Sequence, residues 1–281
     1  MIKTGYLTLS LETTENLSSL LSLKKILQIQ MLALLTQIPD RLIESLSFAD
    51  ISLVPTVTDR HLIYRSAIAF KVRKKPSLER EIFAEQLFNA LVNLPLETES
   101  TTNLNLEVQL IDRVWLAFIL DFSTLQVWLM ALFRQLNPEN CLKKRSPTIG
   151  ITENAIAAHC QYAHARACVL LRLAEQEKIF SSLDLFSTEP LIILNLSNSM
   201  RSLLEQILKI IDQLDGKTPE NWLKVGKDLS QSFLLFERHD RLFDSKNHSK
   251  NQFSWLLLIN TRAILQIILL TKLQIPAPDE L

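Results

Sequence analysis

Two side chains near the centre of the chain have the types and the spacing needed to hold one nucleotide of an RNA. Tyr162 and Arg166 lie four residues apart, so a helix through them places both on one face. An aromatic ring can stack on a base, and a guanidinium can bind a phosphate or stack on the ring. The same spacing also fits a structural role, in which Tyr162 packs in a helical core and Arg166 pairs with a carboxylate. The spacing alone leaves both interpretations open.

Positive charge is clustered at two other places. The denser cluster precedes a predicted helix and comprises Lys71, Arg73, Lys74 and Lys75, with Arg80 one turn into that helix. A shorter run lies in a predicted linker and comprises Lys143, Lys144 and Arg145. Such side chains bind phosphates without regard to sequence, and their contacts weaken as salt rises. The structural alternative is a set of solvated cations at a helix end, since cations favour helix C-termini.

A third group of cations is diluted by carboxylates. Arg238, His239 and Arg241 have the charge to flank the stem of an RNA hairpin, but Glu237 and Asp240 alternate with them. We therefore interpret this segment mainly as a salt-bridged surface.

The sequence predicts neither catalysis nor a cofactor. Its four glycines are far apart, which excludes phosphate-binding loops of the GxGxxG or GxxxxGK type. No Ser-His-Asp order with a glycine elbow is present. His159 and His164 are five residues apart and would lie on different faces of a helix, so no metal site is expected. We expect His164 to be a hydrogen-bonded structural histidine, and the three cysteines, which form no CxxC pair, to be reduced core thiols.

Charge and hydropathy narrow the class of protein further. The 281 residues include 30 basic and 30 acidic side chains, a balance that argues against coating nucleic acid by bulk charge but permits a local basic patch. Two apolar runs, 115–133 and 253–270, carry Asp121 and Arg262 respectively. A charge at the centre of a membrane helix costs about 2.5–3.5 kcal/mol on insertion scales, so we expect buried soluble elements. With no signal-peptide pattern at the N-terminus, we predict a cytoplasmic protein with no membrane contact.

The first half of the chain mixes helix and strand patterns. Helices are predicted over 17–38 and 77–91, with extended pieces around 51–57 and strands over 106–111 and 115–120. Ser123, with Gln126 three residues later, fits a capping box that opens a helix through about Leu136. We predict an α+β domain over residues 1–136 and a linker over 137–147, where Pro138 and Pro147 occur.

The second half, 148–281, is predicted to be an all-α bundle, which makes the chain predominantly helical. Its organising element is a long helix over Glu153–Gln176, with Thr152 as the expected N-cap. Small and apolar residues recur there at three- and four-residue spacing, the period of a buried helical stripe.

The centre of that helix, Gln161-Tyr162-Ala163-His164-Ala165-Arg166, resembles the QYAHAR segment that opens the anticodon-binding DALR domain of arginyl-tRNA synthetases. Three later segments are similar to that domain in the same order. They are Ser232-Phe233-Leu234-Leu235-Phe236 followed by Arg241-Leu242, then Thr261-Arg262, and finally Ile275-Pro276-Ala277-Pro278-Asp279-Glu280-Leu281.

A similar segment occurs in the first half. Residues 64–76, which begin at Tyr64 and contain the Lys71–Lys75 cluster, resemble the N-terminal accessory domain of the same synthetases. In that family a Tyr leads into an apolar helix ending in Ala-Lys-Lys, and the domain contacts the elbow of the tRNA. The resemblance implies RNA contacts at Tyr64, Gln161, Tyr162, Arg166, Phe236, Arg238, Arg241 and Leu281.

The catalytic domain that separates these two parts in a synthetase has no counterpart here. His-x-Gly-His and Lys-Met-Ser-Lys-Ser stretches are absent. The resemblance therefore implies a non-catalytic protein that binds or escorts tRNA, arginine tRNA in the first instance, with a tRNA-modifying enzyme or a synthetase as its partner. The mechanism would be docking by two linked domains.

Several positions depart from the family pattern. Ala67 replaces the Asn that reads a D-loop base, and Glu237-Arg238 replaces the Tyr-Asn that follows the second Phe. Losing a stacking ring removes about 1–3 kcal/mol per base. These departures favour an alternative function, a protein–protein scaffold that keeps the fold, has lost specific RNA binding and uses apolar surface such as 115–133.

Overall fold

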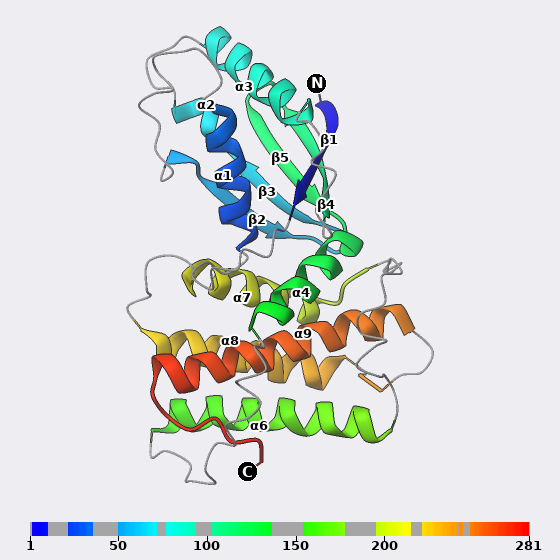
Figure 1. Cartoon of the computed structure of the whole chain (residues 1–281), viewed down its shortest axis with the longest axis vertical. Helices are drawn as coiled ribbons and strands as arrows, with labels where there is room; N and C mark the ends of the chain where they lie inside the picture. The colour runs from blue at the N-terminus through cyan, green and yellow to red at the C-terminus, as the bar shows by residue number, and fades with distance from the viewer. Residues whose placement is uncertain are drawn as a thin grey trace. The chain divides into compact units, whose positions relative to one another are not determined.

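The computed structural model describes residues 2–10, 22–35, 50–71, 77–93, 103–136, 154–177, 195–214, 221–240, 242–243 and 248–280 (Figure 1). The chain forms two compact units, one ending at Leu125 and the other starting at Gln126. The first contains a five-stranded antiparallel sheet and the second is helical, so the expected α+β domain followed by an all-α region is confirmed.

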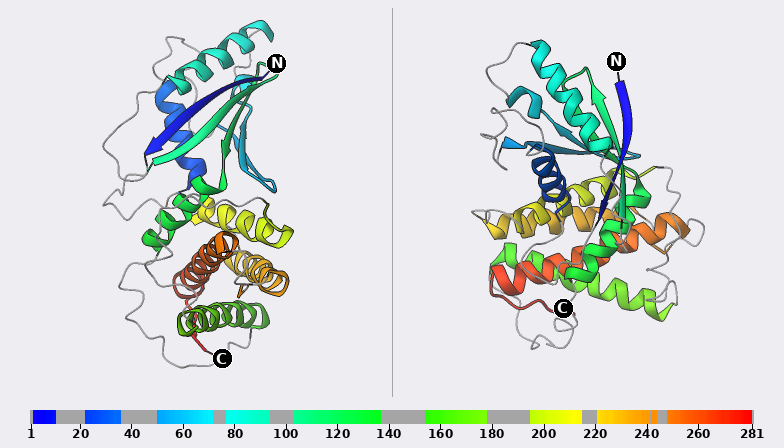
Figure 2. Two further views of the ribbon diagram at one scale, coloured as in Figure 1. Left: turned by 90° about the vertical axis from the view of Figure 1, so that its right-hand side faces the viewer. Right: turned by 45° about the horizontal axis from the view of Figure 1, so that its top comes forward.

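The sheet of the first unit has the strand order β1-β4-β5-β3-β2. Its strands are β1 (Ile2–Ser10), β2 (Leu53–Val57), β3 (Leu62–Ser66), β4 (Asn103–Ile111) and β5 (Trp115–Leu120). Three helices, α1 (Leu23–Leu35), α2 (Ile68–Lys71) and α3 (Ser77–Val92), belong to the same unit (Figure 2).

The two faces of this sheet differ because side chains alternate along each strand. Val108, Phe118 and Tyr64 are paired across β4, β5 and β3, and all three are fully buried. Helix α3 packs close on this face at Gly5, where an added Cβ would stand 2.3 Å from Val92 Cγ2. On the opposite face of the sheet, the side chain of Tyr6 in β1 is exposed.

Most predicted elements of the first unit are present. Helix α1 lies within the predicted 17–38 segment, and α3, β2, β4 and β5 lie close to their predicted bounds. Strand β1 was not predicted. Tyr64, expected to lead directly into an apolar helix, lies in the middle of β3, and only the four residues of α2 follow as helix.

Helix α4 (Phe122–Leu136) begins in the first unit and continues into the second. Its cap is Asp121 and not the predicted Ser123: Asp121 Oδ1 accepts from the Thr124 amide at 2.8 Å and from the Ser123 hydroxyl at 2.8 Å. Asn260 Nδ2 donates to the Leu129 carbonyl oxygen at 3.1 Å, so the later turns of α4 pack with the second unit. The unit boundary therefore falls inside α4, earlier than the predicted position 136, and the predicted linker 137–147 lies outside the described residues.

The second unit contains α6 (Ala155–Gln176), α7 (Asn198–Leu214), α8 (Trp222–His239) and α9 (His248–Ile267). Helix α6 packs against α8 and α9, and its start is capped by Asn154, whose Oδ1 accepts from the Ile156 and Ala157 amides. The predicted cap Thr152 lies outside the described residues. By length and composition the 252–272 stretch is able to cross a membrane, but 78 % of its apolar window is buried inside the protein, as in a core helix.

The C-terminal segment after α9 returns along α6 (Figure 1). Helix α9 continues into a π-helical turn, η3 (Ile268–Lys272), and the chain reverses at Gln274, which has a φ of 55°. The Ile275 amide then donates to the Leu269 carbonyl oxygen at 2.9 Å, closing the helix end. Gln161 Nε2 donates to the Pro276 carbonyl oxygen at 2.9 Å and thereby holds the segment against α6.

Candidate nucleic-acid interface

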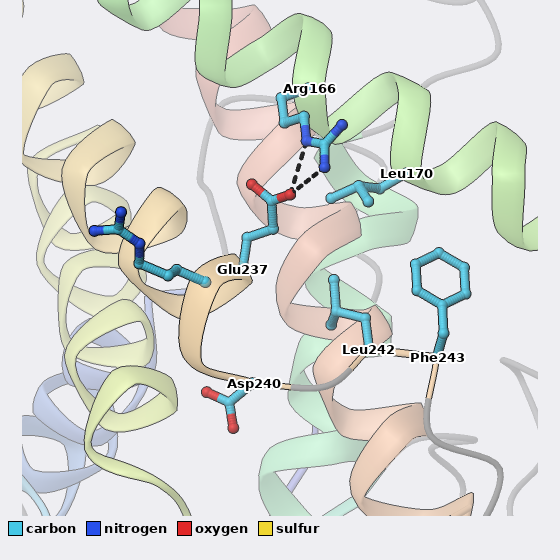
Figure 3. A pocket seen from close by; sticks show the side chains of 7 residues that line it. Arg166, Leu170, Glu237, Asp240, Leu242 and Phe243 are labelled. Carbon is cyan, nitrogen blue, oxygen red and sulfur yellow. Dashed lines mark hydrogen bonds and ion pairs between the residues drawn. The ribbon is translucent and has the colours of Figure 1, made fainter.

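A pocket of about 570 Å³ opens where α6 meets the C-terminal end of α8 (Figure 3). Its lining combines two apolar residues that follow α8, one leucine of α6 and four charged side chains: Leu242, Phe243, Leu170, Arg166, Glu237, Arg238 and Asp240. Rings and cations at the mouth of one hollow are the groups that bind a base and its phosphate. The pocket is therefore the candidate site of the second unit.

An ion pair occupies one wall of the pocket. Arg166 Nε and Nη2 both donate to Glu237 Oε1, at 2.7 and 2.5 Å (Figure 3). The hydrogen bond to Glu237 raises the pKa of the Arg166 guanidinium above its ordinary value. Arg166 thus takes the structural role left open by the sequence, because most of its charge is directed at a neighbouring carboxylate and away from a ligand.

Asp240, the residue that caps the same C-terminal end of α8, has a similar internal role. Its Oδ2 accepts from the hydroxyl of Ser197 at 2.8 Å and from the hydroxyl of Ser199, and Ser197 Oγ also accepts from the Met200 amide. These bonds join the end of α8 to the start of α7. Arg238, on the last turn of α8, is exposed and lines the pocket. A cation in that position also interacts favourably with the negative end of the helix.

Helix α6 presents an outward stripe next to the pocket. Tyr162 is 50 % exposed, and Val169 and Leu173, about two and three turns further along the stripe, are 38 % and 39 % exposed. Tyr162 therefore does not pack in the core, and its ring is available to a ligand. The stripe and the pocket share Arg166, since residues 162, 166, 169 and 173 follow helical spacing.

A second surface, in the first unit, was not predicted from the sequence. The rings of Phe70 and Trp115 lie with centroids 5.3 Å apart, and the Arg80 guanidinium carbon stands 5.9 Å from the Phe70 centroid. Phe70 and Trp115 are 40 % and 38 % exposed. We call these three residues the aromatic cluster. Lys71 follows Phe70 in the chain and is the last residue of α2. It is also the first residue of the predicted basic cluster, and its side chain is exposed.

The sequence carried only a weak signal for the aromatic cluster. Phe70 and Arg80 lie on either side of the Lys71–Lys75 run, but Trp115 comes more than thirty residues later and was assigned to a buried apolar run. Only the pairing of Leu116 with Ser66, which brings the start of β5 beside the end of β3, places that ring near Phe70.

Three predicted RNA contacts are corrected by burial. Tyr64, Gln161 and Phe236 have no exposed surface, each being 0 % exposed. Tyr64 lies inside the sheet core, Phe236 faces the helical core, and Gln161 is used to bind the C-terminal segment. Burial follows from their place in the elements, because each lies on the inward face of its strand or helix.

Other predicted residues lie outside the described residues. They are Arg73, Lys74, Lys75, Lys143, Lys144, Arg145, Arg241 and Leu281. The prediction for His164 is confirmed: it is 1 % exposed and its Nδ1 lies 2.8 Å from the Pro278 carbonyl oxygen.

Comparisons of the chain with protein-family models, curated proteins and solved structures gave no significant match.

Proposed function

We propose that the chain is a non-catalytic tRNA-binding or tRNA-escort protein, which binds arginine tRNA through its two units. The pocket and the stripe of α6 would contact the anticodon arm, and the aromatic cluster with Lys71 would contact the elbow. A tRNA-modifying enzyme or a synthetase would be the partner that receives the tRNA.

The observation that carries this proposal is that the segments resembling the anticodon-binding domain meet around α6. Arg166 binds Glu237, 71 residues away, and Gln161 binds the Pro276 carbonyl, 115 residues away. Arg172 pairs with Glu280 and also donates to the Asp279 carbonyl oxygen at 2.9 Å. The segments that resemble the anticodon-binding domain, together with the residues that directly follow them, thus contact one another in the folded chain. Such contacts are expected if this chain packs its helices as that domain does.

The side chains of the two surfaces suit an RNA interface made of two separate sites, each of which binds weakly. Each surface offers exposed aromatic rings for stacking and a few cations for phosphates, contacts that are largely independent of sequence. Linking two weak sites in one chain raises the effective concentration at the second site once the first is bound. The net charge of the chain is zero, which is compatible with RNA binding when the contacts are confined to two local surfaces.

The test is binding of transcribed arginine tRNA to the full chain, compared with a tRNA of another identity at two salt concentrations. The Tyr162→Ala and Arg238→Ala variants are expected to weaken binding, and Arg238→Ala also to reduce the dependence on salt. Lys209→Ala, which removes an exposed cation of α7, is the matched control. Equal binding by all four proteins would exclude the pocket as the contact.

A second candidate function, a protein–protein scaffold, is favoured by one specific observation. The Arg166–Glu237 pair uses a cation that the family would offer to RNA, while apolar side chains of the second unit remain exposed: Phe243 at the pocket at 41 %, and Leu235 elsewhere on α8 at 50 %. A scaffold would bind no tRNA at low salt and would lose its protein partner on Phe243→Ala.

A further inference from the structure

Three side chains with metal-binding atoms meet where the C-terminal segment crosses α6. They are His164 and Cys168, both buried, and Asp279, which is exposed, and their ligand atoms all lie within 4.8 Å of one another. Cys168 Sγ is 3.9 Å from each of the two His164 ring nitrogens and donates to Asp279 Oδ1 at 3.5 Å. No metal site was predicted from the sequence, because His159 and His164 lie on different faces of the helix and Asp279 is more than a hundred residues away in the chain.

We propose that His164, Cys168 and Asp279 form a binding site for a zinc ion, with water as the fourth ligand. Zn–S bonds of about 2.3 Å and Zn–N or Zn–O bonds of about 2.0–2.2 Å place neighbouring tetrahedral ligand atoms roughly 3.5 Å apart. The Sγ–Oδ1 separation already has this value, and the sulfur–nitrogen separation exceeds it by a few tenths of an ångström. Thiolate with imidazole and one carboxylate is a donor set that suits zinc better than magnesium or calcium.

The protein holds each ligand in place from outside the site. His164 and Cys168 are one turn apart on the same face of α6, so the helix fixes their spacing. The Pro278 carbonyl can only accept, so the neutral ring of His164 carries its proton on Nδ1 and offers the lone pair of Nε2. Asp279 is delivered by the C-terminal segment, which Gln161 and Arg172 bind on either side.

The charges at the site allow the exchange of a proton for the ion. In the metal-free protein the Cys168 thiol carries its proton and donates a hydrogen bond to Asp279 Oδ1. On binding, the S–H bond breaks, an S–Zn bond forms and the proton leaves to solvent; no electron is transferred. Two positive charges of the ion are then balanced by the thiolate and the Asp279 carboxylate. That balance limits repulsion from Arg262 and Arg172, the cations that act on Cys168.

The ion would fasten the C-terminal segment to α6 in addition to the hydrogen bonds that Gln161 and Arg172 already make to it. Zinc binding would therefore slow hydrogen exchange at the backbone amides of this segment, which are those of Ile275, Ala277, Asp279 and Glu280 because Pro276 and Pro278 have none. The same ligands give the site a spectroscopic signature, because cobalt(II) in a tetrahedral site with one thiolate shows a thiolate-to-metal charge-transfer band.

The test is titration of the full chain, first stripped with a chelator, with cobalt(II) and then zinc(II). We expect one equivalent of cobalt to produce the charge-transfer band and one equivalent of zinc to abolish it. Cys168→Ala is expected to remove the band, and Asp279→Asn, an exposed change that leaves the fold intact, to weaken cobalt binding at least about tenfold.

Two cysteine variants are the controls. Cys160→Ala removes a buried thiol two turns earlier on α6, and Cys141→Ser removes the third thiol of the chain. Both should keep the full cobalt band. No charge-transfer band in the unaltered protein would overturn the proposal. So would a band that persists in Cys168→Ala, or unchanged affinity in Asp279→Asn together with unchanged exchange at residues 275–280.

Discussion

Arg80 in the first unit and Arg166 in the second are cations in contrasting surroundings. Arg166 is held by two hydrogen bonds to Glu237, whereas Arg80 stands over the Phe70 ring and its Nε has no hydrogen-bond partner among the described residues. Because the Arg80 Nε is buried, a phosphate contact of this residue would use its terminal Nη groups, whereas Arg166 directs both Nε and Nη2 at Glu237. If the chain binds RNA as proposed, we therefore expect the stronger phosphate contact in the first unit, although more of the segments quoted for the resemblance lie in the second.

The largest effect is expected where a predicted RNA contact is a core residue. Phe236→Ala should lower the free energy of unfolding by about 3–5 kcal/mol, because it empties a fully buried site. Leu235→Ala, one residue earlier and 50 % exposed, should change it by less than about 0.5 kcal/mol. Urea denaturation measures both. Similar values for the two variants would show that Phe236 does not support the core.

Removal of a stacking ring from the aromatic cluster comes next. Trp115→Ala should weaken tRNA binding by about 1–3 kcal/mol, the usual contribution of one stacked base, while Trp115→Phe should retain most of the affinity. Ile82→Ala, an exposed apolar change on α3, is the control. Titration of labelled tRNA gives the three affinities. If Trp115→Ala binds as tightly as Ile82→Ala, the cluster is not an RNA contact.

Release of Arg166 should strengthen binding modestly. Glu237→Gln removes the partner carboxylate, so affinity for tRNA should rise by up to about fivefold, since an ion pair that solvent still reaches, as at this partly exposed pair, is worth about 0.2–1 kcal/mol. The slope of log affinity against log salt should steepen by about 0.7 for the added phosphate contact. Glu205→Gln, an exposed change of equal charge on α7, separates local from general electrostatic effects. A decrease in affinity would mean that the pair itself positions the RNA.

The smallest effect is expected for a cation of the first unit that is already paired. Arg113 Nη1 lies 3.1 Å from Glu81 Oε2, and the Arg113 side chain is 62 % exposed. Arg113→Ala should lower the free energy of unfolding by no more than about 1 kcal/mol and leave tRNA affinity unchanged. Arg80→Ala, which removes the stacked cation, should weaken tRNA binding; an equal loss in Arg113→Ala would remove the distinction between paired and stacked cations.

Helical periodicity was sufficient for most of the fold. The buried face of α6 and the apolar runs of α4 and α9 are visible in the spacing of their own apolar residues, so each helix could be predicted without knowing its partners. Strand β1 was not predicted although Leu7 and Leu9 are buried and Tyr6 is exposed, because this alternation covers only a few residues. The caps at Asp121 and Asn154 each fell within two residues of the predicted ones, a normal error at helix ends.

Less of the candidate site could be predicted from the sequence, because the role of each side chain depends on residues that are distant in the chain. Whether Arg166 faces a ligand or a carboxylate depends on Glu237, which belongs to another helix. Gln161 was expected to face RNA, but the returning C-terminal segment covers it. The aromatic cluster likewise requires strand pairing to bring Trp115 to Phe70.

The most direct test of tRNA binding is to purify the full chain at low salt, extract the RNA that accompanies it and sequence that RNA. Our account predicts enrichment of arginine tRNAs over their share of total RNA, with less recovered as salt rises. Absence of RNA, or RNA with no selectivity for tRNA, would contradict it and leave the scaffold function as the explanation of the exposed apolar surface.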